Sequence, residues 1–150
     1  MKKQAGKYRE DQYAYWIFII ILIIGTFLFF KYDINEFVYP VIILTLVAII
    51  FYKLTIIITS EEIVAYFGFG LFKRKMKLSD IDFSSIQKIK LNWWTGIGVR
   101  YTTNGWLYNV KLGEAIKIMS KDKARVFFIG TDEFSSIKKI ISDELNNQET

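Results

Sequence analysis

Hydrophobic residues follow two different patterns in this chain, one before Lys53 and another after it. From Tyr13 to Phe30 there is no charged side chain, and a second uncharged run extends from Phe37 to Tyr52. After Lys53, apolar and polar positions alternate in short segments. Long apolar runs are typical of buried or membrane-spanning helices, whereas alternation with a period of two is typical of strands. The pattern predicts a helical hairpin followed by a β-rich domain.

The two uncharged runs have nearly the dimensions of membrane-spanning helices. The first contains 18 residues, which as a helix would be about 27 Å long, against ~30 Å for the hydrocarbon core of a bilayer. The second contains 16 residues and has Pro40 near its start, where a missing N–H is tolerated. We therefore predict transmembrane helices at 13–30 and 37–52. A cleaved signal peptide is the alternative for the first run, and a buried core helix for the second.

Basic residues are more frequent in segment 1–12, and in the region after the second run, than in the link at 31–36. The positive-inside tendency then predicts a multi-pass protein of the cell membrane with both termini in the cytoplasm. In this interpretation, 1–12 is a cytoplasmic N-terminal segment, 13–52 is the membrane hairpin and 53–150 is a separate domain.

The alternating region predicts eight short strands and one helix. Asn104-Gly105 between two alternating runs is a strong hairpin signal, because both residues tolerate positive φ. Apolar residues recur at helical spacing over 132–146, which predicts a C-terminal helix there. The expected fold is a membrane hairpin plus a mostly-β domain, an antiparallel barrel or sandwich of about seven or eight strands. The predicted strands are 54–59, 63–67, 72–78, 86–91, 97–102, 106–110, 115–119 and 124–129.

The composition removes most catalytic chemistry. The chain has no cysteine and no histidine, so thiol and imidazole nucleophiles and the usual ligands of zinc, haem and iron–sulfur clusters are absent. We predict a protein that is not an enzyme and that uses no cofactor or metal. The net charge of +5 at pH 7 has a membrane explanation, and no recognition-helix motif is present. Nucleic acid is therefore not an expected partner.

Three segments carry a resemblance to a known group. They read GIGVRYT at 96–102, GWLYN at 105–109 and FIGTDE at 128–133. With the β-rich region and the final amphipathic helix, they resemble small bacterial membrane proteins in which two transmembrane helices precede a pleckstrin-homology (PH)-like domain. Phe134 stands where that group often has proline. The resemblance implies a PH-like fold and a membrane location, but no reaction.

The densest basic cluster is the first candidate site. Four basic residues, Lys73, Arg74, Lys75 and Lys77, follow one another in a predicted strand. They are candidates for contact with anionic lipid headgroups, although the alternating lysines favour the alternative of a solvated strand face. PH domains that bind phosphoinositides usually have basic residues in their first hairpin, whereas the corresponding predicted turn here, 60–62, is acidic. The resemblance therefore disfavours specific phosphoinositide binding.

An aromatic group is the second candidate site. Trp93 and Trp94 stand in a glycine-flanked loop close to Arg100. Exposed aromatic rings beside an arginine are typical of protein-binding surfaces, whereas burial in the core is the commoner fate of aromatic residues. We therefore take Trp93, Trp94 and Arg100 as a candidate interaction surface.

Three functions compete at this level. The first is a membrane-anchored, PH-like interaction module without catalytic activity, which binds a protein partner or its own copies at the cytoplasmic face. The second is a sensor of anionic lipid surfaces. The third is a small oligomeric channel or transporter subunit, although neither apolar run carries a charge to line a pathway. The expected partners are the lipid bilayer and either another protein or a second copy.

Overall fold

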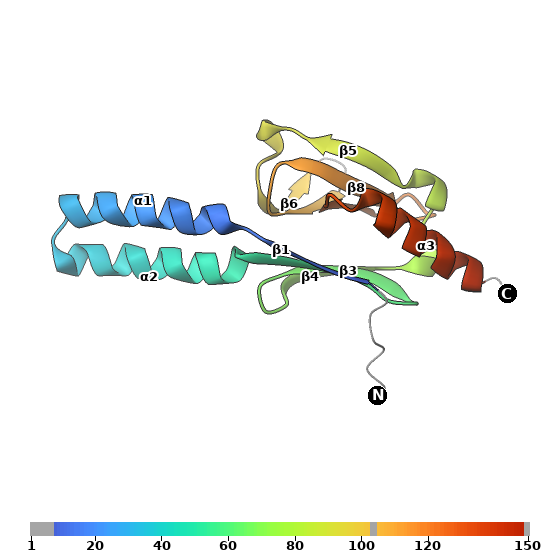
Figure 1. Ribbon diagram of the computed structural model, residues 1–150, viewed down its shortest axis with the longest axis horizontal. Helices are drawn as coiled ribbons and strands as arrows, with labels where there is room; N and C mark the ends of the chain where they lie inside the picture. The colour runs from blue at the N-terminus through green and yellow to red at the C-terminus, as the bar shows by residue number, and fades with distance from the viewer. Residues whose placement is uncertain (1–7, 103–104, 149–150) are drawn as a thin grey trace, which may run out of the picture.

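The computed structural model describes residues 8–102 and 105–148, which form nine strands and three α-helices (Figure 1). In order along the chain they are β1 (Tyr8–Tyr13), α1 (Tyr15–Lys31), α2 (Ile34–Phe51), β2 (Lys53–Ile58), β3 (Glu62–Phe67), β4 (Leu71–Lys77), β5 (Gln87–Leu91), β6 (Gly98–Thr102), β7 (Gly105–Asn109), β8 (Gly113–Met119), β9 (Val126–Gly130) and α3 (Phe134–Gln148). Single 3₁₀ turns occur at Leu78–Asp80, Phe83–Ser85 and Trp93–Thr95.

The first sheet is antiparallel and contains the helical hairpin as an insertion. Its strand order is β1-β2-β3-β4, and β1 pairs with β2 from Tyr8↔Ile58 to Tyr13↔Lys53. Helices α1 and α2 therefore connect two neighbouring strands of one sheet, and they extend away from it in Figure 1. The base of this insertion is closed by the Ala14 N–H, which donates to the Tyr52 carbonyl at 2.8 Å.

The second sheet is mixed. Its strand order is β5-β8-β9-β7-β6, and the β7–β9 pair is parallel while the other pairs are antiparallel. Strand β9 pairs antiparallel with β8 on one side and lies beside β7 on the other, where the two strands run in the same direction. Helix α3 follows β9 and packs near the connection from β4 to β5.

The main core lies between the two sheets and α3. Leu54 and Ile56 of β2 contribute from one side, Ile116 and Ile129 from the other, and Ile137 from α3, each almost fully buried. Alternation explains this arrangement, because every second residue of a strand points to the same face. A smaller cluster on the opposite face of the second sheet contains Leu91, Leu107, Ala115 and Phe128.

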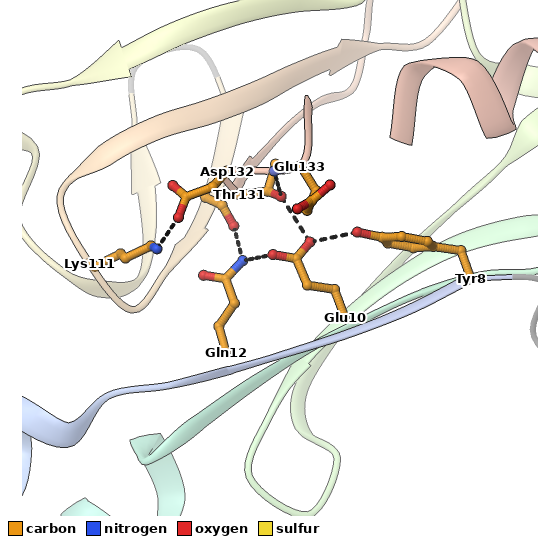
Figure 2. A network of polar contacts seen from close by, with 8 residues as sticks. Tyr8, Glu10, Gln12, Lys111, Thr131, Asp132 and Glu133 are labelled. Atoms are coloured by element: carbon orange, nitrogen blue, oxygen red, sulfur yellow. Dashed lines mark hydrogen bonds and ion pairs between the residues drawn. The ribbon is translucent and has the colours of Figure 1, made fainter. Parts of the chain in front are cut away.

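Polar contacts join β1 to the segment between β9 and α3 (Figure 2). The Glu10 carboxylate accepts hydrogen bonds from Thr131 Oγ1 at 2.8 Å, Tyr8 at 3.1 Å and Gln12 Nε2 at 2.7 Å. Gln12 Nε2 also donates to the Gly130 carbonyl at 2.8 Å. Burial, together with the neighbouring Glu10 carboxylate, raises the pKa of Tyr8, so its hydroxyl stays protonated and able to donate. These bonds fasten the N-terminal strand to the C-terminal half.

The predicted membrane spans at 13–30 and 37–52 are wrong. No helix that the structure describes has both the length and the apolar character needed to cross a membrane. Helix α1 begins only at Tyr15, because Tyr13 belongs to β1, and its 17 residues are about 26 Å long, short of the ~30 Å hydrocarbon core. The prediction of a multi-pass cell-membrane protein with both termini in the cytoplasm is wrong for the same reason.

The predicted fold class is also wrong, although most elements lie close to their predicted positions. A PH-like meander after a separate hairpin is contradicted, because the hairpin is inserted between β1 and β2 and the second sheet contains a parallel pair. Residues 8–12 of the predicted N-terminal segment form most of β1, and residues 1–7 lie outside the described part of the structure. The chain instead combines an antiparallel sheet that carries two helices, a mixed sheet and a C-terminal helix.

Candidate functional site

The most unusual surface of this protein is its apolar hairpin, which consists of α1 and α2. The two helices pack along each other, and near the tip the rings of Phe29 and Phe37 meet edge to face at 5.9 Å. In Figure 1 the hairpin extends well beyond both sheets. Neither sheet therefore covers its outer half, and each helix buries only the side that faces its partner.

Large apolar side chains cover the hairpin on its exposed sides. A side chain of this size carries roughly 200 Å², so sixteen that are about half exposed amount to on the order of 1,500 Å². The largest apolar patch on a typical monomer is roughly 300–600 Å². The sixteen exposed residues, among those described, are Tyr15, Phe18, Ile19, Ile20, Leu22, Ile23, Phe27, Phe29, Phe30, Val38, Tyr39, Ile42, Ile43, Leu46, Val47 and Ile49.

The polar groups within the hairpin are satisfied locally. Thr26 Oγ1 donates to the Leu22 carbonyl at 2.7 Å, and Thr45 Oγ1 donates to the Val41 carbonyl at 2.8 Å. At the tip, the Lys31 ammonium lies 5.6 Å from the ring centre of Phe27. Because neither threonine needs an outside partner, the helix surfaces can be covered by apolar groups without an unpaired hydroxyl.

The base of the hairpin is fixed to both sheets. Trp16 Nε1 donates to the carbonyl of Val110, directly after β7, at 2.7 Å, and the ring of Phe51 meets that of Phe67 in β3 at 5.4 Å. A mostly apolar cleft of about 300 Å³ lies at this base, between the two helices and Val99 of β6. These contacts therefore fix the orientation of the hairpin relative to the two sheets.

The predicted basic cluster divides between two faces of β4. Lys73, Lys75 and Lys77 are exposed on one face, and Lys75 forms an ion pair with Glu62 at 3.1 Å. Arg74 points the other way, and its guanidinium lies 4.7 Å from the ring centre of Trp106. The four basic residues thus do not form one surface, because strand alternation separates Arg74 from the lysines.

The predicted aromatic surface is only partly described. Trp94 is 87% exposed in the 3₁₀ turn after β5, whereas the side chain of Trp93 lies outside the described part of the structure. The Arg100 side chain is folded against the backbone of Gly96, where a Cβ would lie 2.4 Å from Nη2. The Arg100 side chain therefore packs against the protein. Among the described side chains of this group, the exposed one is that of Trp94.

The described residues contain no cluster of three or more aspartates and glutamates that could hold a metal ion. In the polar contacts of Figure 2, the Glu10 carboxylate lies beside the hydroxyls of Thr131 and Tyr8, and these contacts hold β1 in place. Asp80, Asp82 and Asp122 all have a lowered pKa because a neighbouring arginine or serine hydrogen-bonds to each carboxylate. These carboxylates are stabilised in their charged form by the hydrogen bonds of surface turns, which they cap. They are therefore poorly suited to accept a proton near neutral pH.

Sequence reasoning identified the residues of the hairpin but assigned them to a membrane. A run of uncharged residues carries the same signal whether lipid or protein covers it. Comparisons of the chain with protein-family models, with curated proteins and with solved structures returned no match. The resemblance to small bacterial membrane proteins with a PH-like domain is contradicted by the topology. The three predicted functions all required a membrane location, and they are contradicted because no described helix could cross a membrane.

Proposed function

We propose that copies of this chain assemble with one another through the apolar hairpin, so that the protein serves as a self-assembling structural component. In this arrangement, α1 and α2 of one copy pack against α1 and α2 of the next. The observation that carries the proposal is the row of sixteen exposed apolar side chains on a helical pair that projects from both sheets. Helices that are apolar on every side are stable only when other apolar groups surround them.

The exposed area supports a second copy as the occupant. A stable protein interface buries roughly 800 Å² on each partner, and half of the hairpin surface provides about that amount. Two hairpins packed side by side would form a four-helix bundle, a common way to cover such helices. Because apolar residues also cover the remaining sides, we expect assembly to continue beyond a pair.

The distribution of charge supports an identical partner rather than a different protein. Among the described residues of the two helices and their link, the charged ones are Lys31, Asp33 and Glu36, and all three lie at the tip. Interfaces between different proteins are usually selected by complementary charges. Two copies of a surface that has no charges along its length do not repel each other electrostatically. An isologous contact between them needs only self-complementary packing.

Sedimentation velocity of the intact protein in detergent-free buffer tests the proposal. We expect a species larger than the monomer at micromolar concentration. The double substitution Leu22→Lys with Ile43→Lys places two charges on exposed hairpin positions, and burying them in an interface would cost several kcal/mol. We expect this variant to sediment as a monomer. Phe83→Lys, which places a charge on an exposed apolar side chain outside the hairpin, is the control and should assemble like the original protein.

Two outcomes would contradict the proposal. A wild-type protein that stays monomeric at high concentration would show that the hairpin does not mediate self-association. Recovery of the intact protein from cells only with lipid, as a monomer once it is extracted in mild detergent, would show that lipid covers the hairpin instead. Circular dichroism of the double variant must match the wild type, so that loss of assembly is not mistaken for loss of folding.

A further inference from the structure

A second pocket lies where the edge strand β4 meets the second sheet. Its volume is about 260 Å³, close to that of pockets for small molecules. Its walls come from β4, from the β6–β7 hairpin and from the segment that leads into β9. The residues that matter for the argument are Arg74, Tyr101, Trp106, Arg125 and Phe127.

Arg74 is held in place on one wall by an aromatic stack. Its guanidinium lies 4.7 Å from the ring centre of Trp106, and the Trp106 ring meets Tyr101 edge to face at 5.4 Å. A guanidinium stacked on a ring keeps its N–H groups pointing outward in its own plane, where they can meet an oxyanion. Among the described carboxylates, none forms an ion pair with Arg74.

Arg125 approaches from the turn between β8 and β9. Its backbone N–H donates to Ser120 Oγ at 3.0 Å, and its carbonyl accepts from the Ser120 N–H at 2.9 Å. Its guanidinium is paired with Asp80 at 2.8 Å. One ion pair uses only part of the five N–H donors of an arginine, so Arg125 is oriented by Asp80 and retains donors for a ligand.

The lining of this pocket contains positive charge but no acidic residue within the described part of the chain. We propose that the pocket binds a small organic anion, one that combines a phosphate or carboxylate group with a flat apolar part. The oxyanion would be held between the guanidinium groups of Arg74 and Arg125. The apolar part would rest on the rings of Trp106, Tyr101 and Phe127. This pocket is separate from the hairpin, so the proposal stands independently of self-assembly.

Binding of phenyl phosphate to the intact protein, followed by titration calorimetry, tests this inference. We expect saturable binding that weakens about tenfold in Arg74→Met, which keeps an unbranched side chain while removing the charge and the N–H donors. Arg125→Met should also weaken binding. Lys73→Met, one residue away on the opposite face of β4, removes the same charge and is the matched control. Its affinity should stay within about twofold of wild type, because exposed charges outside the pocket are screened by salt.

Further ligands separate the contributions of charge and ring. Inorganic phosphate should bind more weakly than phenyl phosphate, and benzyl alcohol should not bind measurably. The proposal is overturned if phenyl phosphate shows no saturable binding, if benzyl alcohol binds equally well, or if Lys73→Met weakens binding as much as Arg74→Met. Capture of the protein by phosphatidylserine vesicles without any binding of phenyl phosphate would overturn it too, because the anion would then be recognised only on a lipid surface.

Discussion

Glu10 in the first strand accepts a hydrogen bond at 2.8 Å from Thr131, which lies 121 residues further along the chain, immediately before the C-terminal helix. Thr131 is almost fully buried, and its hydroxyl oxygen also accepts from the Glu133 N–H at 2.9 Å. One threonine therefore links β1 to the second half of the protein and helps to orient the start of α3 (Figure 2).

Thr131→Val is expected to lower the free energy of unfolding by about 1–3 kcal/mol, because the half-buried Glu10 carboxylate and the Glu133 N–H each lose a partner. Urea unfolding followed by circular dichroism measures the change. Thr45→Val is the matched control, because the Thr45 hydroxyl bonds only to a carbonyl of its own helix. That control should change stability by less than about 0.5 kcal/mol. Equal stability of Thr131→Val and wild type would show that the link is not important.

Asp11 should make stability depend on acid pH. Burial alone raises the pKa of its carboxyl, but hydrogen bonds from Thr55, Lys53 and Arg9 outweigh burial and leave the pKa below its usual value. A carboxyl whose pKa is lower in the folded state stabilises the fold above its unfolded pKa, near 3.9, and loses this contribution as the pH falls further. The stability difference between wild type and Asp11→Asn should therefore be constant above about pH 5 and shrink below about pH 4. A difference that does not change with pH would contradict this assignment.

Gly105→Ala should be strongly destabilising. Gly105 has a φ of +144°, and a Cβ there would lie 2.2 Å from the Val126 carbonyl oxygen, which belongs to the backbone of β9. Two strands would have to move apart, at a cost of about 2 kcal/mol or more. Gly113→Ala is the control, because Gly113 has a similar φ of +136° but open space around it. Thermal unfolding should show a larger loss for Gly105→Ala, and equal losses would mean that φ alone sets the cost.

Arg100→Met is expected to increase stability or leave it unchanged. Nε and Nη2 of Arg100 are buried without a hydrogen-bond partner in the described structure. An unsatisfied buried donor costs about 1–3 kcal/mol, and methionine fills a similar space without polar atoms. Chemical denaturation of Arg100→Met, compared with the exposed Lys90→Met, measures the effect. A clear loss of stability in Arg100→Met alone would show that the guanidinium has a partner in solution.

Local sequence patterns determined most elements of this protein. Alternation over 72–78 placed Arg74 and Met76 on one face, and the structure has Met76 buried and Arg74 stacked on Trp106. Asn104-Gly105 predicted a hairpin, and β6 and β7 pair through Thr102↔Gly105, although residues 103 and 104 lie outside the described part. These successes share a cause, because side-chain periodicity and turn preference depend on near neighbours alone.

The first strand was missed because its sequence gives no local signal. Segment 8–13 reads YREDQY, which has charged residues at three successive positions and no apolar alternation. It is a strand because β2 offers hydrogen bonds along its whole length and because Thr131 and Gly130 accommodate Glu10 and Gln12. These partners lie far away in the sequence, so no local pattern can predict them.

The sequence by itself determined that two apolar helices, eight further strands and a terminal helix form, since each depends on spacing within a few residues. Only the tertiary structure decided how they combine. Pairing of β1 with β2 takes Tyr13 out of the first helix and turns the helical hairpin into an insertion within a sheet. Similarly, the parallel pairing of β7 with β9 brings Arg125 and Arg74 to one pocket. Strand pairing is chosen by burial between distant segments, and that information is spread over the whole chain.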